Sequence, residues 1–106
     1  MIKRIVLVYK RDEMSGEEFR KYYIAHHGPI VAQMPGLLYY RQNPTLPDSD
    51  GNEQEISGIA EIWYENDAAL HHAMSSPQAA AANASLANFV DVSRTKIIPV
   101  EEYIIL

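Results

Sequence analysis

The sequence has 106 residues, of which 47% are hydrophobic and 22% charged, a size and balance typical of one globular domain. It contains no cysteine, which excludes a disulfide scaffold, a thiolate metal site and a cysteine nucleophile. The net charge of -5 argues against a nucleic-acid partner, because such binders usually present a basic surface. No apolar run approaches the roughly 18 residues of a membrane span, so we expect no membrane partner and a cytoplasmic location.

The first predicted strand covers residues 2–9, which are rich in β-branched side chains and are followed by a charged turn at residues 10–13. Its even-numbered and odd-numbered positions are both largely apolar. A strand with two apolar faces needs cover on both of them.

A helix is predicted after Ser15, because Ser15 and Glu18 have the spacing of a capping box. Its aromatic and histidine positions recur at helical spacing, at Phe19, Tyr22, Tyr23 and His26. The Gly28-Pro29 pair is expected to interrupt the helix, and Pro35-Gly36 to end the element after one further turn.

Strands are predicted at residues 37–43 and 56–64, separated by a polar loop. Asn66 or Asp67 is expected to cap a second helix, which restarts at Ser76-Pro77 and continues through the alanine-rich residues 79–87. A last strand is predicted at residues 96–106, where Pro99 indicates an edge position or a bulge.

The element order is therefore βαββαβ, an α+β ferredoxin-like fold in which two helices cover one face of a four-stranded antiparallel sheet. Residues 1–106 form a single domain. The open face of the sheet also carries apolar residues, and a second copy of the same face is the simplest cover for it. The pattern thus predicts a homodimer formed through the open sheet face.

A set of motifs spreads over nearly the whole chain. They are the segments at residues 14–19, 22–23, 26–29 and 35–37, and then 58–64, 76–77 and 88–91. The His26-His27-Gly28-Pro29 motif and the Ala-Glu-Ile-Trp strand are the most specific of them. Together they resemble the EthD family of the dimeric α+β-barrel group. The resemblance implies that two sheets pair into a barrel and that each subunit holds a small hydrophobic pocket between helices and sheet.

The wider group includes lactone isomerases, dehydratases, cofactor-free monooxygenases and haem-handling enzymes, so the fold alone does not fix the function. The resemblance implies an isomerase, dehydratase or oxidoreductase-like protein without bound metal, if the protein is an enzyme. Two positions depart from the family: Ser57 and Asn83 stand where relatives often have an acidic residue. No proton-transfer role is therefore assigned to them.

His26 is the first predicted catalytic residue, because its spacing places it on the stripe of Phe19 and Tyr23 and because imidazole titrates near neutral pH. In an alternative interpretation, His26 is a packed residue that donates to a carbonyl freed at Gly28-Pro29.

Glu61 is the second predicted catalytic residue. Its apolar neighbours on the strand are expected to raise its pKa and let it act as a base or orient His26. A hydrogen bond to Arg41 or to a tyrosine, or exposure to solvent, is the structural alternative.

Aromatic side chains and a second histidine are predicted to bind a small hydrophobic ligand. These residues are Phe19, Tyr22, Tyr23, His27, Trp63 and Tyr39. Packing in the core and at the dimer interface is the alternative for most of them.

Neither a metal nor another cofactor is expected. The pairs His26-His27 and His71-His72 are adjacent on helices, so their side chains diverge instead of converging on one ion. A phosphate-binding loop, a nucleophile elbow and a dinucleotide fingerprint are all lacking.

The sequence therefore favours a cofactor-independent enzyme that moves a proton, or carries out oxidative chemistry, on a small carbonyl, lactone or aromatic metabolite. A non-catalytic dimer that binds or carries such a metabolite is the alternative, and a structural dimer with a vestigial pocket is the third.

Overall fold

The computed structural model of the protein describes residues 1–106. Four strands form one sheet in the order β2-β3-β1-β4, with every neighbouring pair antiparallel. They are β1 (Ile2–Val8), β2 (Leu37–Pro44), β3 (Gly58–Tyr64) and β4 (Lys96–Val100). This is the ferredoxin-like arrangement that the sequence predicts, and β4 lies at an edge as Pro99 indicated.

The first helical element is continuous from Gly16 to Val31. It consists of α1 (Gly16–Tyr22), a π-helical turn η1 (Tyr23–His27) and α2 (Gly28–Val31). Both hydrogen bonds of the capping box at Ser15 are present. The predicted interruption at Gly28-Pro29 is wrong: the Gly28 N–H donates to the Tyr23 carbonyl, and the helical backbone continues through Pro29 to Val31.

The second helical element is divided into α3 (Asp67–Met74) and α4 (Pro77–Leu86). The Asn66 side chain accepts from the Ala69 N–H at 2.9 Å, and the Ser76 hydroxyl accepts from the Ala79 N–H at 3.2 Å. Both predicted helix starts are thus confirmed. A 3-10 turn, η2 (Val92–Arg94), leads into β4.

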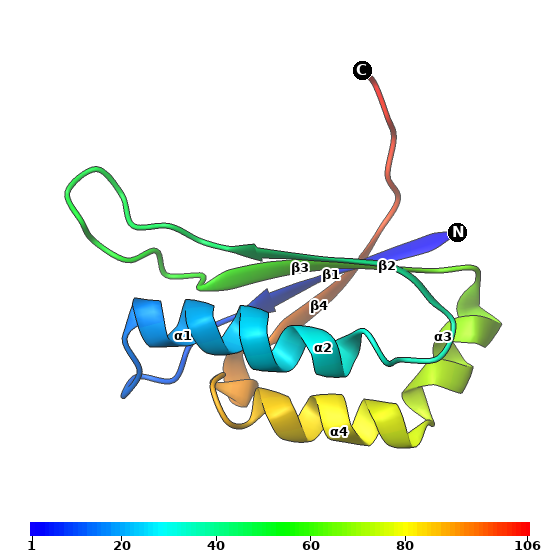
Figure 1. The fold of residues 1–106 in the computed structure, drawn as a ribbon. Coiled ribbons are helices and arrows are strands. Elements are labelled where there is room, and N and C mark those ends of the chain that lie inside the picture. The colour runs from blue at the N-terminus through cyan, green and yellow to red at the C-terminus, as the bar shows by residue number, and fades with distance from the viewer.

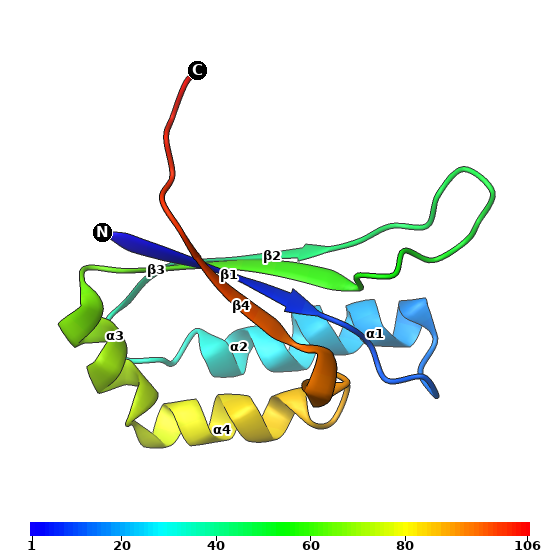
Figure 2. The ribbon, with the colours of Figure 1, turned by 180° about the vertical axis from the view of Figure 1, so that it is seen from behind.

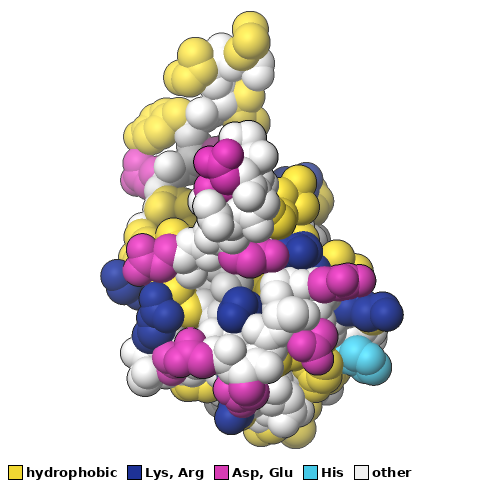
Figure 3. Space-filling model, turned by 90° about the vertical axis from the view of Figure 1, so that its left-hand side faces the viewer, with side chains coloured by type: hydrophobic (Ala, Val, Ile, Leu, Met, Phe, Trp, Pro, Cys, Tyr) yellow, Lys and Arg dark blue, Asp and Glu magenta, His cyan; other side chains and the backbone are white.

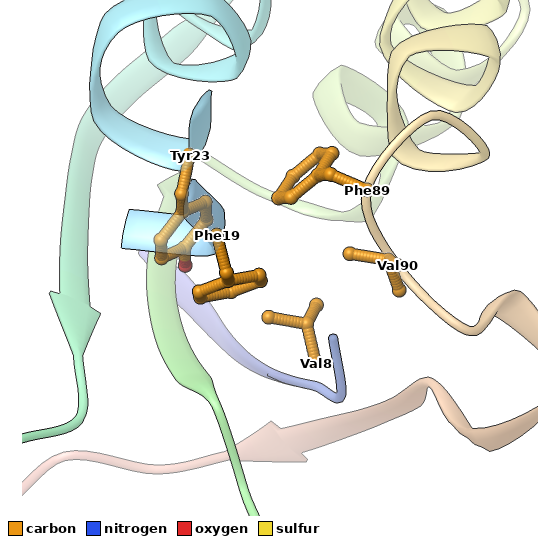
Figure 4. Packing of buried hydrophobic residues seen from close by; sticks show 5 residues of the cluster. All are labelled: Val8, Phe19, Tyr23, Phe89 and Val90. Atoms are coloured by element: carbon orange, nitrogen blue, oxygen red, sulfur yellow. The ribbon is translucent and has the colours of Figure 1, made fainter. Parts of the chain in front are cut away.

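All the helices lie on one side of the sheet (Figures 1 and 2). Two hydrophobic clusters fill the space between the layers. The first contains Val8, Phe19, Tyr23, Phe89 and Val90, which point toward one another from β1, the first helical element and the segment after α4 (Figure 4). The second contains Met34, Tyr64, Ala73 and Ala79. They lie toward opposite ends of β1, because Val8 pairs with Gly58 and Ile2 pairs with Tyr64.

The opposite face of the sheet has no helix over it (Figure 1). Ile5 and Leu7 of β1 lie there, and so do the exposed Tyr39 of β2 and Ile98 of β4. This surface is called the open face below. The prediction that β1 has apolar residues on both of its faces is therefore confirmed.

The last strand ends at Val100, so the prediction that it continues to residue 106 is wrong. Val100 pairs with Lys3, close to the beginning of β1, and the chain beyond it runs out of partner backbone. Residues 101–106 rise from the sheet on the side opposite the helices (Figures 1 and 2). Tyr103, Ile104, Ile105 and Leu106 are almost fully exposed, and hydrophobic side chains stand clear of the body at this end in Figure 3.

Gly58→Ala is expected to destabilise the protein, because a methyl group at this position overlaps two buried side chains. The added Cβ lies 2.8 Å from Tyr23 Cε2 and 3.0 Å from Val8 Cγ2. Overpacking of this kind costs about 1–3 kcal/mol of unfolding free energy, measurable by urea titration. Ala80→Ser, on the exposed side of α4, adds one heavy atom as a control and is expected to change stability by about 0.5 kcal/mol or less. Equal stability of the two variants would contradict the packing of Tyr23 over Gly58.

Candidate functional site

A cavity of about 130 Å³ lies between the helices and the sheet, and it is lined mostly by hydrophobic side chains. Its wall includes members of both hydrophobic clusters, among them Val8, Tyr23, Met34 and Tyr64. An apolar cavity of about 150 Å³ takes up benzene in an engineered protein. The cavity therefore has room for a ligand about the size of one aromatic ring.

Small side chains on α4 leave this space open. Ala79 and Ala82 face the cavity, opposite Val6 and Ile62 of the sheet. An alanine on the inner side of a packed helix fills much less volume than the leucine or phenylalanine that usually closes such a layer. The alanine-rich sequence of α4 thus has a structural consequence beyond its helix propensity.

His27 is the histidine of the cavity. Its side chain is buried, and Nδ1 lies 3.0 Å from the Ser85 hydroxyl of α4. The ring packs against Phe89 with centroids 5.0 Å apart. Burial lowers the pKa of His27 to about 4, so the ring is neutral at physiological pH and is able to accept a proton.

The π-turn explains why His27 occupies this place and His26 does not. In a regular α-helix, the 3.6-residue period puts His26 nearer than His27 to the direction of Phe19. A π-turn bonds each residue to the fifth one along and so takes up more residues in a revolution. His27 is thereby brought under Tyr23, whereas His26 is exposed and stacks on Tyr22 at 4.9 Å. The prediction that His26 lies on the buried stripe is wrong.

Two buried hydroxyl groups that belong to cavity-lining residues have no hydrogen-bond partner. They are the Tyr23 hydroxyl and the Thr95 Oγ1, both buried. Buried polar groups are nearly always paired, so an unpaired group in a cavity wall indicates a partner that arrives with the ligand. Burial raises the pKa of Tyr23 and raises that of Tyr40, also in the wall, to about 12, so both keep their protons.

Gln42 holds the two tyrosines in place. Its Nε2 donates to the Tyr40 hydroxyl and to the Tyr23 backbone carbonyl, each at 2.8 Å. The second bond is made to a carbonyl of the π-turn, so β2 is tied to the segment that orients His27.

Glu61 lies on the open face, away from the cavity. It accepts from Lys3 Nζ at 2.8 Å and from Asn43 at 3.1 Å. The hydrogen bond from Lys3 is the main reason that the pKa of Glu61 is lowered, and the predicted rise in that pKa is therefore wrong. Lys3 is buried, because it also contacts Glu102 at 2.7 Å and lies 4.4 Å above the Trp63 ring. Glu61 thus belongs to a charged cluster beside Trp63 and does not meet His26.

The structure separates the residues predicted to bind a ligand. Tyr23 and His27 line the cavity, whereas Phe19 and Tyr22 pack in and against the first hydrophobic cluster. Trp63 and Tyr39 stack edge to face on the open face, with centroids 6.0 Å apart. The catalytic and binding roles assigned to the residues outside the cavity stay predictions.

Three polar residues of the site were not singled out from the sequence: Arg4 and Thr95, which line the cavity, and Ser85, which bonds to His27. Ser85 had a usable signal, because it is one of two polar residues that interrupt the alanine run of α4. Arg4 had another, because a charge stands on the strand face that otherwise carries Ile2, Val6 and Val8.

No group of three or more histidine and acidic side chains converges as a metal site requires. None of the helices has the length and apolar composition needed to cross a membrane.

The EthD domain model matches residues 11–93, most of the chain. The protein belongs to the EthD family. An uncharacterized 11.0 kDa protein from the thcB-thcC intergenic region of Rhodococcus erythropolis is 28% identical over 102 residues, covering 96% of this chain and 97% of that protein. The resemblance on which the sequence analysis relied is thus confirmed.

Two solved structures show that the EthD chain shares its fold with proteins of low sequence identity. An ethyl tert-butyl ether d (EthD) family protein of Bacillus halodurans is similar with a TM-score of 0.76 and 19% identity, over 97% of this chain and 100% of that one. SnoaB of Streptomyces nogalater, described as a cofactor-independent oxygenase, is similar with a TM-score of 0.66 and 14% identity, over 99% and 95% of the two chains.

The buried His27 is expected to make the stability of this EthD protein fall in mild acid. Its pKa is about 4 when folded and 6.5 when unfolded, so between these values the unfolded chain binds the extra proton. Stability is then lost as the pH falls from about 6.5 toward about 4. His27→Asn, whose amide replaces Nδ1 toward Ser85, should lose less stability between about pH 7 and about pH 4.5 in urea titrations. The matched variant His26→Asn, at an exposed ring, should keep the pH dependence of the parent, and equal behaviour of the two variants would contradict a buried neutral His27.

Proposed function

We propose that the cavity binds a small hydrophobic metabolite that carries a carbonyl or phenolic oxygen, and that His27 moves a proton on it without a cofactor. One observation carries the proposal. A neutral imidazole, held through Nδ1 by Ser85, lines an apolar cavity together with Tyr23, whose hydroxyl is unpaired and whose ring centroid lies 6.2 Å from that of His27. A base and a hydrogen-bond donor near one small apolar space are what proton transfer next to a carbonyl requires.

The Ser85 hydroxyl fixes the orientation of the His27 ring. A hydroxyl both donates and accepts, so it can bond to Nδ1 in either neutral tautomer. When Nδ1 carries the hydrogen, Nε2 has a free lone pair and takes a proton from the carbon beside the carbonyl. The oxygen that becomes negative then accepts a hydrogen bond from the Tyr23 hydroxyl. Return of the proton from Nε2 to a different carbon completes an isomerisation.

The low dielectric of the cavity sets the protonation states that this role uses, and it also makes His27 a weaker base than a free imidazole. Burial keeps His27 neutral and Tyr23 protonated, which are the states that a base and a donor need. The likeness to SnoaB, a cofactor-independent oxygenase, is consistent with a protein of this fold acting on a bound molecule with its own side chains. Proton removal from a phenol by the same base is the step that oxidative chemistry would share.

Exchange of α-protons for deuterium tests the proposal directly. Acetophenone and phenylacetaldehyde are one-ring carbonyl compounds whose exchange is followed by proton NMR in deuterium oxide. The protein is expected to accelerate the exchange, and His27→Asn is expected to reduce the rate about 100-fold or more, since general bases contribute about that much. Tyr23→Phe should lower the rate less, because it removes one donor and leaves the base.

His26→Asn is the matched control and should retain the full exchange rate, because His26 is exposed outside the cavity. Exchange that is equally fast with His27→Asn would contradict the assignment of the base. Binding of the carbonyl compounds without any acceleration would instead indicate a carrier.

We also propose that the protein is a homodimer in which two open faces meet. The open face and the segment of residues 101–106 together expose apolar side chains that no part of the same chain covers. Two solved proteins of this fold are described as dimeric. The Lys3–Glu61 and Lys3–Glu102 ion pairs lie on this face, so the partner would meet a surface on which the charge of Lys3 is already neutralised.

Sedimentation tests the dimer. The protein should sediment as a dimer of the 12.0 kDa chain at micromolar concentration, and Ile98→Glu should produce the monomer because it places an unpaired charge in the apolar contact. Ile24→Glu changes an exposed isoleucine of the helical layer and should leave the dimer intact. A stable monomer of the unchanged protein would refute the proposed contact.

A further inference from the structure

Arg4 is an arginine without a partner, and it lies in the wall of the cavity. The chain has five arginines. Arg11, Arg20 and Arg94 form ion pairs with glutamates, and Arg41 lies 5.0 Å above the Trp63 ring. Arg4 makes no ion pair, side-chain hydrogen bond or aromatic contact, although it is half-buried and faces the helices.

The surroundings of Arg4 offer it little compensation. It pairs across the sheet with Ile62 and Pro99, and Val6 and Ile97 lie beside it in the cavity wall. Removing a charge from water without pairing it is costly, so a half-buried arginine with these apolar neighbours is suited to an anion that comes from outside the chain. Asp67 lines a neighbouring hollow with Arg4 but does not reach ion-pair distance.

Arg4 and His27 stand at different places along the cavity. Tyr23 lies over Gly58, which pairs with Val8, whereas Arg4 pairs with Ile62 at the far end of the same strand face. Along the helix, Val31 lies about one turn beyond His27, and both Val31 and Ile62 pack against the second cluster. Arg4 and His27 therefore line different parts of one cavity.

From this arrangement we infer that the ligand is a small carboxylic acid with an apolar body of about one ring. Its carboxylate pairs with Arg4, its ring fills the cavity, and its remaining oxygen lies near His27 and Tyr23. Arginine suits this role because its planar fork of donors matches both oxygens of a carboxylate. The inference rests on the proposed function, in that it names the class of molecule that occupies the same cavity.

Two probes that differ in charge test whether the cavity prefers a carboxylic acid. 4-Hydroxybenzoate and 4-hydroxybenzamide have the same ring and hydroxyl, and their binding is measured by calorimetry and by the NMR signals of the His27 ring. The protein should bind the acid at least about tenfold more tightly than the amide, as expected for a charge-assisted contact. In Arg4→Met, which keeps an apolar stem of similar length, the two affinities should become equal.

Arg41→Met is the matched control, because Arg41 lies on the open face, and it should keep the preference for the acid. Equal affinity of the unchanged protein for acid and amide, with the His27 signals shifting, would overturn the acid and leave the proposed cavity chemistry standing. Retention of the preference in Arg4→Met would overturn Arg4 as the anion site. If neither probe moves the His27 signals, both the acid and the cavity as a ligand site are refuted.

Discussion

The packing of Phe89 against the first helical element is the contact on which the arrangement of the site depends. Phe89 is fully buried, and its ring lies 5.4 Å from Phe19, 5.9 Å from Tyr23 and 5.0 Å from His27. Phe89, a single residue in the segment that follows α4, thus packs against three inward-facing residues of the first helical element. It closes one end of the space between the layers and leaves the part beside α4, where the side chains are alanines, unfilled.

The two faces of the sheet manage polar groups in opposite ways. On the open face, Lys3 is surrounded by Glu61, Glu102 and the Trp63 ring, so its buried charge is neutralised within the chain. On the helical face, Arg4 and the Tyr23 hydroxyl are left without partners. Lys3 has all its charge partners within the chain, whereas Arg4 has none. A charged ligand is therefore expected at Arg4 and not at Lys3.

Most of the fold was predictable from local sequence signals. The caps at Ser15, Asn66 and Ser76 mark helix starts, and the two-faced pattern of residues 2–9 marks the central strand. These signals work because they act within a few residues of where they stand. The end of the last strand was not predictable in the same way, since it depends on how far β1 extends beside it.

The site was less predictable, for physical reasons. The lowered pKa of Glu61 comes from Lys3, which is 58 residues away and adjacent only in the sheet. His27 lies in the cavity instead of His26 because the helix has a π-turn here. A prediction that assumes a regular period of 3.6 residues cannot foresee such a turn. Tyr23 was correctly placed inside because it is the first residue of that turn, before the extra residue shifts the helical period.

The π-turn also affects how this chain is compared with others. A π-turn accommodates one additional residue inside a helix without breaking it, so it behaves as an insertion absorbed within a helix. In a relative with a regular helix at this place, a gapless alignment sets the inward residue of that relative opposite His26 and not opposite His27. Alignments across residues 23–27 therefore need a one-residue gap before the histidines of two such proteins can be equated.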